Sequence, residues 1–114
     1  MKRIAIVACE NSNTVCAGCA CLNAFYDRRK SFERYAGEEL RLMAFMRCSH
    51  CVKDGDPMQD AGFVEKLERL VSESVEIVHI GLCGGRTEET ACPGMAKMAA
   101  AFREKGLTVV WGTH

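Results

Sequence analysis

The sequence lacks a net charge, a long apolar run and an internal repeat, and each absence excludes a class of protein. Fifteen lysine and arginine residues balance fifteen aspartate and glutamate residues, so no overall charge attracts nucleic acid or an acidic partner. No apolar run reaches the roughly 18–20 residues that a membrane-spanning helix needs. The chain has the length of one domain and contains no linker, so we expect residues 1–114 to form a single domain.

An export signal is also lacking. The apolar part of the N-terminus, residues 4–8, is too short for a signal peptide, and the polar residues 10–13 follow it closely. We therefore interpret this segment as a first strand and expect a cytoplasmic protein. With 48% hydrophobic residues the chain can build a core without cross-links, so its eight cysteines indicate metal binding or redox chemistry rather than four disulfides.

Apolar runs that alternate with helical patterns predict the element order βαβαβαβ. The expected strands are residues 3–8, 40–47, 75–82 and 107–112. Apolar residues at helical spacing predict three helices. The first begins near Cys19, the second follows the start signal of Asp56 and Pro57, and the third covers residues 95–102 and ends at Gly106, a left-handed cap. This order predicts an α/β fold in three layers, with a four-stranded, mainly parallel sheet of the flavodoxin-like or Rossmann-like kind between helices.

Residues that bind soft metals follow each of the four expected strands. Parallel strands all end at one edge of a sheet, and open α/β sheets bind their ligands in the crevice outside that edge. The residues directly after the strands are Cys9, Cys48, Cys83 and His114, and those in the loops that follow are Cys16, Cys51 and Cys92. We expect these seven residues to lie near one edge, and they are our candidate metal ligands.

The motif Cys48-Ser49-His50-Cys51 is the most compact part of this pattern. Two thiols separated by two residues can clamp a metal ion or act as a redox pair. Thiolates favour zinc, copper(I) or iron–sulfur clusters. Cys48 and Cys51 fit the first pair of a four-ligand site, and Cys83 and Cys92 can supply the second. A bacterial-ferredoxin cysteine run is absent, which argues against that fold.

Other residues leave alternatives open. His50 is either a ligand or a solvated loop residue, and His79 lies inside an expected buried strand, where a hydrogen-bonded core residue is the better interpretation. Gly84 and Gly85 can present backbone amides to an anion, but a plain turn is the commoner use of two glycines. A phosphatase-like loop is excluded, because the position six residues after Cys83 holds no arginine.

Taken in order, these residues resemble the CGGC-domain family of cysteine- and histidine-rich α/β domains. The resemblance runs from Ile4 to His114 and departs at the central motif, where serine and histidine replace two glycines. Against this pattern Cys19 and Cys21 look like additional cysteines. The family implies a metal site, with zinc as the expected ion and iron or an iron–sulfur cluster as the alternative, and it implies no particular reaction.

Two functions fit the pattern. The first is a metal-binding protein with a cysteine-rich site at the carboxyl edge of the sheet. The second is a thiol redox enzyme or a metal-dependent enzyme that uses Cys48 and Cys51. The first is favoured, because no acid or base is evident near the thiols apart from the histidines.

Overall fold

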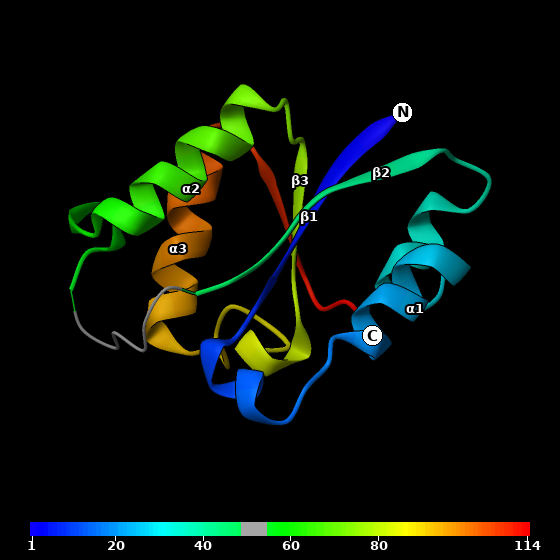
Figure 1. Cartoon of the computed structure of the whole chain (residues 1–114), viewed down its shortest axis with the longest axis horizontal. Helices are drawn as coiled ribbons and strands as arrows, with labels where there is room; N and C mark the ends of the chain where they lie inside the picture. Colours follow the sequence, from blue (N-terminus) through cyan, green and yellow to red (C-terminus); the bar gives the residue numbers. More distant parts are fainter. Residues whose placement is uncertain (49–54) are drawn as a thin grey trace.

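A four-stranded parallel sheet forms the centre of the computed structural model, which describes residues 1–48 and 55–114 (Figure 1). The strands are β1 (Lys2–Ala8), β2 (Leu40–Arg47), β3 (Ile77–Ile80) and β4 (Thr108–Trp111). Their order is β2-β1-β3-β4, and every neighbouring pair is parallel. The predicted α/β fold is therefore confirmed, and its sheet is parallel throughout.

Three α-helices cover the two faces of this sheet, with 3-10 turns in the connections. The α-helices are α1 (Cys19–Asp27), α2 (Ala61–Ser72) and α3 (Pro93–Glu104). The 3-10 turns are η1 (Glu10–Thr14), η2 (Lys30–Tyr35), η3 (Pro57–Gln59) and η4 (Leu82–Gly84). Figure 1 shows α2 and α3 on one face, with α1 and η2 on the other. Among the described helices, none is long and apolar enough to cross a membrane.

Strand β1 is buried on both faces because it is flanked by two strands and two helical layers. Alternate residues of a strand point to opposite faces. Ala5 and Val7 belong to the core cluster under α2 and α3, and Ile4 and Ile6 belong to the cluster under α1 and η2. All four are 0% exposed, as the continuous apolar run of the sequence predicts for a central parallel strand.

The pairing register brings the residues after the strands together. The β1–β2 register ends at Ala8 opposite Arg47, so Cys9 and Cys48 follow at the same level of the sheet. Cys48 continues this ladder, because its amide donates to the Ala8 carbonyl over 3.0 Å. On the other side of β1, Val7 pairs with Ile80, so the η4 turn also leaves from this edge. We call this end of the sheet the carboxyl edge.

The start signal at Asp56 and Pro57 belongs to η3 rather than to α2. Asp56 Oδ1 accepts a hydrogen bond of 2.9 Å from the Met58 amide and caps this short turn. Helix α2 begins after a second cap, because Asp60 Oδ1 accepts from the Gly62 amide over 3.0 Å. The sequence holds two successive aspartate caps, and the first of them placed the predicted start of α2 before its actual start. The predicted left-handed cap at Gly106 is confirmed by its φ of 86°.

Gly84 and Gly85 form a plain turn. The Gly84 amide donates to the Gly81 carbonyl over 2.9 Å, and the Gly85 amide donates to the Leu82 carbonyl over 3.1 Å. Both amides are thus used inside the turn, which argues against the anion-binding alternative. Two features favour glycine at position 85. Its φ is 141°, and an added Cβ would lie 2.5 Å from Ala91 Cα.

We expect Gly85→Ala to lower the free energy of unfolding by about 3 kcal/mol, because left-handed strain and a backbone overlap act together. The matched control is Gly37→Ala. Gly37 has a φ of 78° but no atom within 4 Å of an added Cβ, so it should lose only about 1 kcal/mol. Chemical denaturation of both variants measures the difference. Equal losses of unfolding free energy in the two variants would show that the overlap with Ala91 does not destabilise the protein.

Candidate thiol site

The sulfurs of Cys48 and Cys83 are held by two consecutive backbone amides at the end of β1. The Cys9 amide donates to Cys83 Sγ over 3.0 Å, and the Glu10 amide donates to Cys48 Sγ over 3.1 Å. Consecutive residues are about 3.8 Å apart, so the two sulfurs are separated by about 10 Å at most. Hydrogen bonds from amides stabilise negative charge on sulfur, which is the form that binds metals.

Topology explains this arrangement. Strand β1 lies between β2 and β3, so the chain that leaves β1 passes between the ends of both neighbours. Cys48 is half-buried, whereas Cys83 is exposed in the η4 turn. At the end of β1, the half-buried sulfur of Cys48 therefore lies on the β2 side and the accessible sulfur of Cys83 lies on the β3 side.

Cys21 also reaches this edge, from the first turn of α1. It is only 5% exposed, and its Sγ lies 3.1 Å from Thr113 Oγ1 and 3.8 Å from His114 Nδ1. A Cβ added at Gly81 would lie 3.8 Å from the Cys21 sulfur and 3.4 Å from the Cys83 sulfur. These two sulfurs thus face the same small space, which the missing side chain of Gly81 leaves open.

The environment of Cys21 keeps it a neutral thiol. Burial raises the pKa of Cys21 above its ordinary value, and the nearby sulfurs of Cys83 and Cys16 raise it further. The hydrogen bond with Thr113 opposes this rise in pKa, as does the more distant charge of Arg47. The raised pKa therefore favours the neutral thiol of Cys21, which lies beside one candidate ligand.

The sequence pattern treated Cys21 as an additional cysteine, but a signal for its position was present. Cys21, Ala24 and Phe25 follow i, i+3, i+4 spacing and form the buried face of α1. A cysteine on the buried stripe of a helix that covers the sheet must point inward. Cys19 lies off this stripe at the first position of α1 and is exposed.

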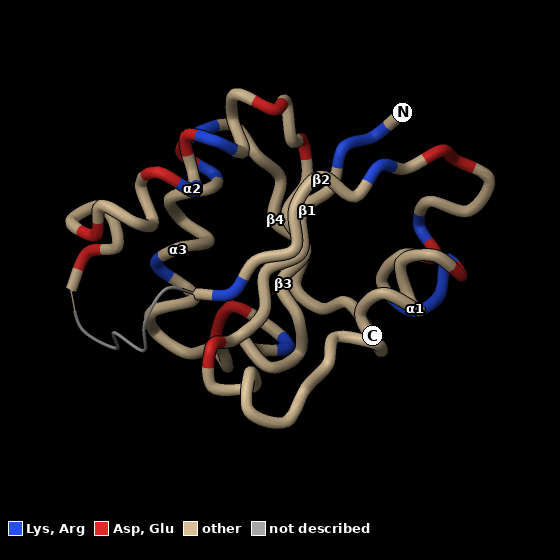
Figure 2. The backbone as a smooth tube through the Cα atoms, in the orientation of Figure 1, with Lys and Arg blue, Asp and Glu red and all other residues tan. Residues whose placement is uncertain are grey.

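The loop that carries Cys16 contacts Arg47 from β2. Figure 2 shows no charged residue between η1 and the last turn of α1, in keeping with the uncharged sequence of residues 11–26. Arg47 Nη1 donates to Ser12 Oγ over 3.2 Å, and Arg47 Nη2 donates to the Cys16 carbonyl over 3.4 Å. Cys16 is exposed, and its Sγ accepts from the Gly18 amide over 3.3 Å.

Of the remaining predicted ligands, Cys92 and His114 lie within the described residues and Cys51 lies outside them. Cys92 precedes α3, and its amide donates to the Gly84 carbonyl over 3.2 Å, so it lies beside the η4 turn. Its side chain packs against the core cluster under α2 and α3, as does that of Cys48. His114 contacts Cys21 rather than Cys48 or Cys83 in the described contacts. Cys51 and His50 are outside residues 1–48 and 55–114.

Within the part of the chain that the structure describes, no group of three or more histidine, cysteine, aspartate or glutamate side chains is spaced to hold a metal ion. The described cysteines are all free thiols. The edge thus brings together Cys48 and Cys83 around the Cys9–Glu10 backbone, with Cys16 and Cys21 on the α1 side. We call these five cysteines (Cys9, Cys16, Cys21, Cys48 and Cys83) the edge cluster.

His79 is a hydrogen-bonded core residue, as predicted. Its Nδ1 lies 3.2 Å from the Gly112 carbonyl, and its Nε2 lies 2.8 Å from the Tyr35 hydroxyl. A carbonyl can only accept, so Nδ1 carries the proton and Nε2 accepts from Tyr35. The ring stacks on Phe32 at 4.2 Å and 22°. Because Gly112 precedes Thr113 and His114, this contact helps to fix the segment that reaches Cys21.

Burial lowers the pKa of His79 from its ordinary value of 6.5 to about 4. The hydrogen bond to Gly112 opposes this fall, and the charge of Arg34 adds to it. His79 is 0% exposed, so its neutral form is the one compatible with the packed core.

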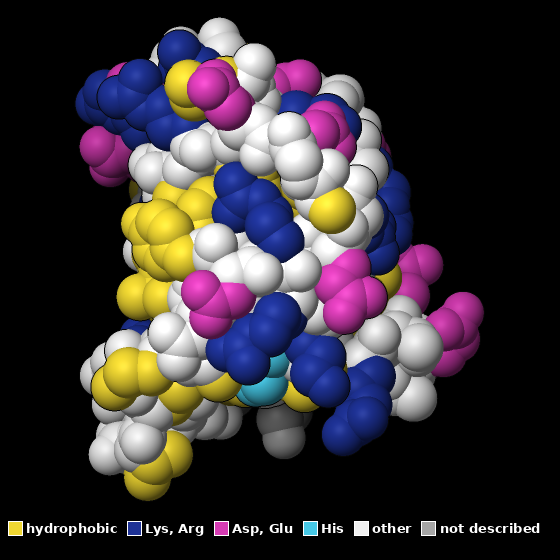
Figure 3. All heavy atoms as spheres, turned by 90° about the vertical axis from the view of Figure 1, so that its right-hand side faces the viewer, with side chains coloured by type: hydrophobic (Ala, Val, Ile, Leu, Met, Phe, Trp, Pro, Cys, Tyr) yellow, Lys and Arg dark blue, Asp and Glu magenta, His cyan; other side chains and the backbone are white. Residues whose placement is uncertain are grey.

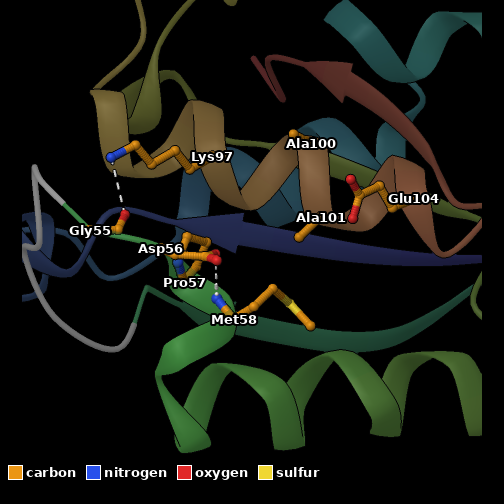
Figure 4. A pocket seen from close by; sticks show the side chains of 8 residues that line it. All are labelled: Gly55, Asp56, Pro57, Met58, Lys97, Ala100, Ala101 and Glu104. Carbon is orange, nitrogen blue, oxygen red and sulfur yellow. Dashed lines mark hydrogen bonds between the residues drawn. The ribbon is translucent and has the colours of Figure 1, made fainter.

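A cavity of about 430 Å³ lies away from the edge cluster, between η3 and α3 (Figure 4). Its walls include Met58, Ala100 and Ala101, and Lys97 Nζ donates to the Gly55 carbonyl at one side over 3.0 Å. None of the described residues that line it is a cysteine or histidine. Its described lining therefore shares no residue with the edge cluster.

Comparison with known proteins gives one match. The family model described as the CGGC domain matches residues 3–114 of the chain. No curated protein and no solved structure matches the chain.

Proposed function

The chain belongs to the CGGC-domain family, and on that premise we propose that it is a metal-binding protein that holds zinc at the carboxyl edge of its sheet. The observation that carries the proposal is the pair of consecutive amides that donate to Cys83 and Cys48. Two sulfurs in anion-stabilising positions at one sheet edge suit a soft ion.

The ligand set that we propose starts from Cys48 and Cys83. Cys51 and Cys92 are the further thiols proposed to complete a four-ligand site, with Cys9, Cys16 and His114 around it. Sulfur ligands suit zinc, and they also suit iron or an iron–sulfur cluster, which stays the alternative cofactor. When bound to these four thiols, the ion would cross-link the segments that follow β2 and β3 and so stabilise this edge.

Binding is favoured over catalysis by the nature of the contacts. The described hydrogen bonds of the Cys48 and Cys83 sulfurs include one from a backbone amide each, and such amides stabilise a thiolate but do not transfer protons. We propose a structural, sensing or storage role on this ground. The cytoplasmic location expected from the sequence would keep the thiols reduced and available to the metal.

We expect protein purified without oxygen to contain about one equivalent of zinc per chain. Elemental analysis measures the metal, and titration with a thiol reagent before and after chelation counts the thiols that it protects. The expected result is that chelation removes the zinc and raises the number of reactive thiols. Metal-free protein whose thiols react equally with and without added zinc would contradict the proposal.

A second candidate is thiol redox chemistry, and the position of Cys21 favours it. The described thiols that face a shared space are Cys21 and Cys83, one buried and one exposed. An oxidant such as hydrogen peroxide would take two electrons and two protons from them, forming one S–S bond and leaving two water molecules. Peptide mapping after oxidation of chelated protein tests this pair. Cys21→Ser, which removes one of the two sulfurs, should prevent that disulfide.

A further inference from the structure

A smaller cavity of about 230 Å³ lies between α1 and the turn that follows it, and its polar lining is basic or amide in character. The lining residues are Ala20, Asn23, Ala24, Arg29, Lys30 and His114. None of these six residues is acidic. On a chain with no net charge, this gathering of positive groups around a hollow is a local feature.

The turn that carries the two cations has an unusual backbone. Arg28 and Lys30 both have a φ of 55°, in the left-handed region that residues other than glycine rarely adopt. Such strain persists where the surroundings fix it, and it is concentrated at functional sites. The Arg28 side chain ties the turn to the body of the protein by donating to the carbonyls of Phe25 and Glu38. Arg29 and Lys30 are left to line the cavity.

The opposite wall is built from the end of the chain, and it is also held in place. Thr113 is fully buried, and its Oγ1 lies 2.9 Å from His114 Nδ1. Ser31 Oγ donates to the Gly112 carbonyl over 2.7 Å, which joins this segment to η2. The positions of the His114 ring and of the Lys30 turn are therefore coupled through hydrogen bonds, and the cavity is preformed.

We propose that this cavity binds an oxyanion, the carboxylate or phosphate group of a small molecule. Arg29 offers a planar guanidinium fork, Lys30 an ammonium group and Asn23 an amide NH₂, which are suited to such groups. Figure 3 shows Lys and Arg side chains gathered around a histidine on one face of the molecule. The volume is below the roughly 300–1,000 Å³ of pockets for drug-sized ligands, so the ligand is small.

The ion pair of Arg29 with Asp27 does not block the cavity. Asp27 Oδ2 lies 3.2 Å from Arg29 Nη2, but their side chains are 59% and 60% exposed. Exposed pairs of this kind contribute little, so Arg29 is free to turn toward an anion.

This proposal goes beyond metal binding, and it does not depend on the four thiols proposed to hold the ion. None of the described residues that line the cavity is a cysteine, and His114, at 3.8 Å from Cys21 Sγ, connects the cavity with the edge cluster. The bound anion is therefore expected beside the edge cluster rather than within it. Anion binding should survive in Cys48→Ser protein, so failure of one proposal is distinguishable from failure of the other.

The test titrates the full chain with inorganic phosphate and, separately, with succinate as a carboxylate probe. Calorimetry measures affinity, and nuclear magnetic resonance follows the Asn23 side-chain amide and the His114 ring. We expect saturable binding of at least one probe, with both signals shifting. The double variant Arg29→Gln with Lys30→Asn should weaken binding at least tenfold, because two charge-assisted contacts are lost. Asparagine tolerates the left-handed conformation at position 30.

The matched control removes two exposed positive charges elsewhere, with Arg69→Gln on α2 and Lys105→Asn after α3. It should bind the probes as the unaltered protein does. Phosphate binding alone would assign the site to phosphate groups, and succinate binding alone to carboxylates. Absence of saturable binding, equal affinity in the cavity variant, or an equal loss in the control would overturn the proposal. Thermal unfolding of both double variants confirms that they are folded.

Discussion

Substitution of either Cys48 or Cys83 by serine is expected to abolish stoichiometric zinc binding. Each sulfur accepts a backbone amide at the exit of β1, and each belongs to the pair on which the proposed site is built. Structural zinc sites release about 10–16 kcal/mol on binding, so one of four ligands is worth about 3 kcal/mol, or more than a hundredfold in affinity. Competition with a chromophoric chelator measures this loss.

Two cysteine variants serve as controls for this result. Cys19→Ser should bind zinc normally, because Cys19 is exposed at the start of α1. Cys21→Ser should also leave binding intact, because Cys21 is a buried neutral thiol held by Thr113. Full zinc affinity in both Cys48→Ser and Cys83→Ser protein would contradict the proposed ligand set. If Cys21→Ser abolishes a disulfide and leaves zinc unaffected, the metal and redox candidates separate.

The stability of the fold is expected to fall by about 3 kcal/mol as the pH decreases from about 6.5 to about 4, through His79 alone. Its pKa is about 4 in the folded protein, against an ordinary value of 6.5. Between these values the unfolded chain binds a proton that the folded chain does not, so stability rises with pH. At about 1.4 kcal/mol per pH unit, the interval is worth about 3 kcal/mol. Below about pH 4 this contribution becomes constant.

Carboxylates titrate in the same range, so the His79 contribution needs a variant that lacks only the titration. His79→Gln retains a donor and an acceptor for Gly112 and Tyr35 but does not ionise. Urea denaturation at pH 7, 5.5 and 4 should show a shallower loss of stability for this variant than for the unaltered protein. The same slope for both would mean that His79 is not the buried neutral group described above.

The sequence by itself determined the elements and their order. The apolar residues 4–8 indicated a strand covered on both faces, and Gly106 marked the end of α3. These features are local, since they depend on side-chain periodicity and on backbone preferences within a few residues. The thiols after the first three strands followed from the same reasoning, because parallel strands share one carboxyl edge. Helix α2 was the exception, where two successive aspartate caps obscured its start.

Only the tertiary structure decided which sulfurs meet, and on which side of the sheet. The strand order put β1 between β2 and β3, so the Cys9 and Glu10 amides can reach Cys83 and Cys48 at once. The same packing turned Cys21 inward and brought the end of the chain against it. Strand order, register and helix facing are set by contacts between residues far apart in the chain. No local pattern encodes them, and so the cavity beside Arg29 and Lys30 emerged only when the chain was folded.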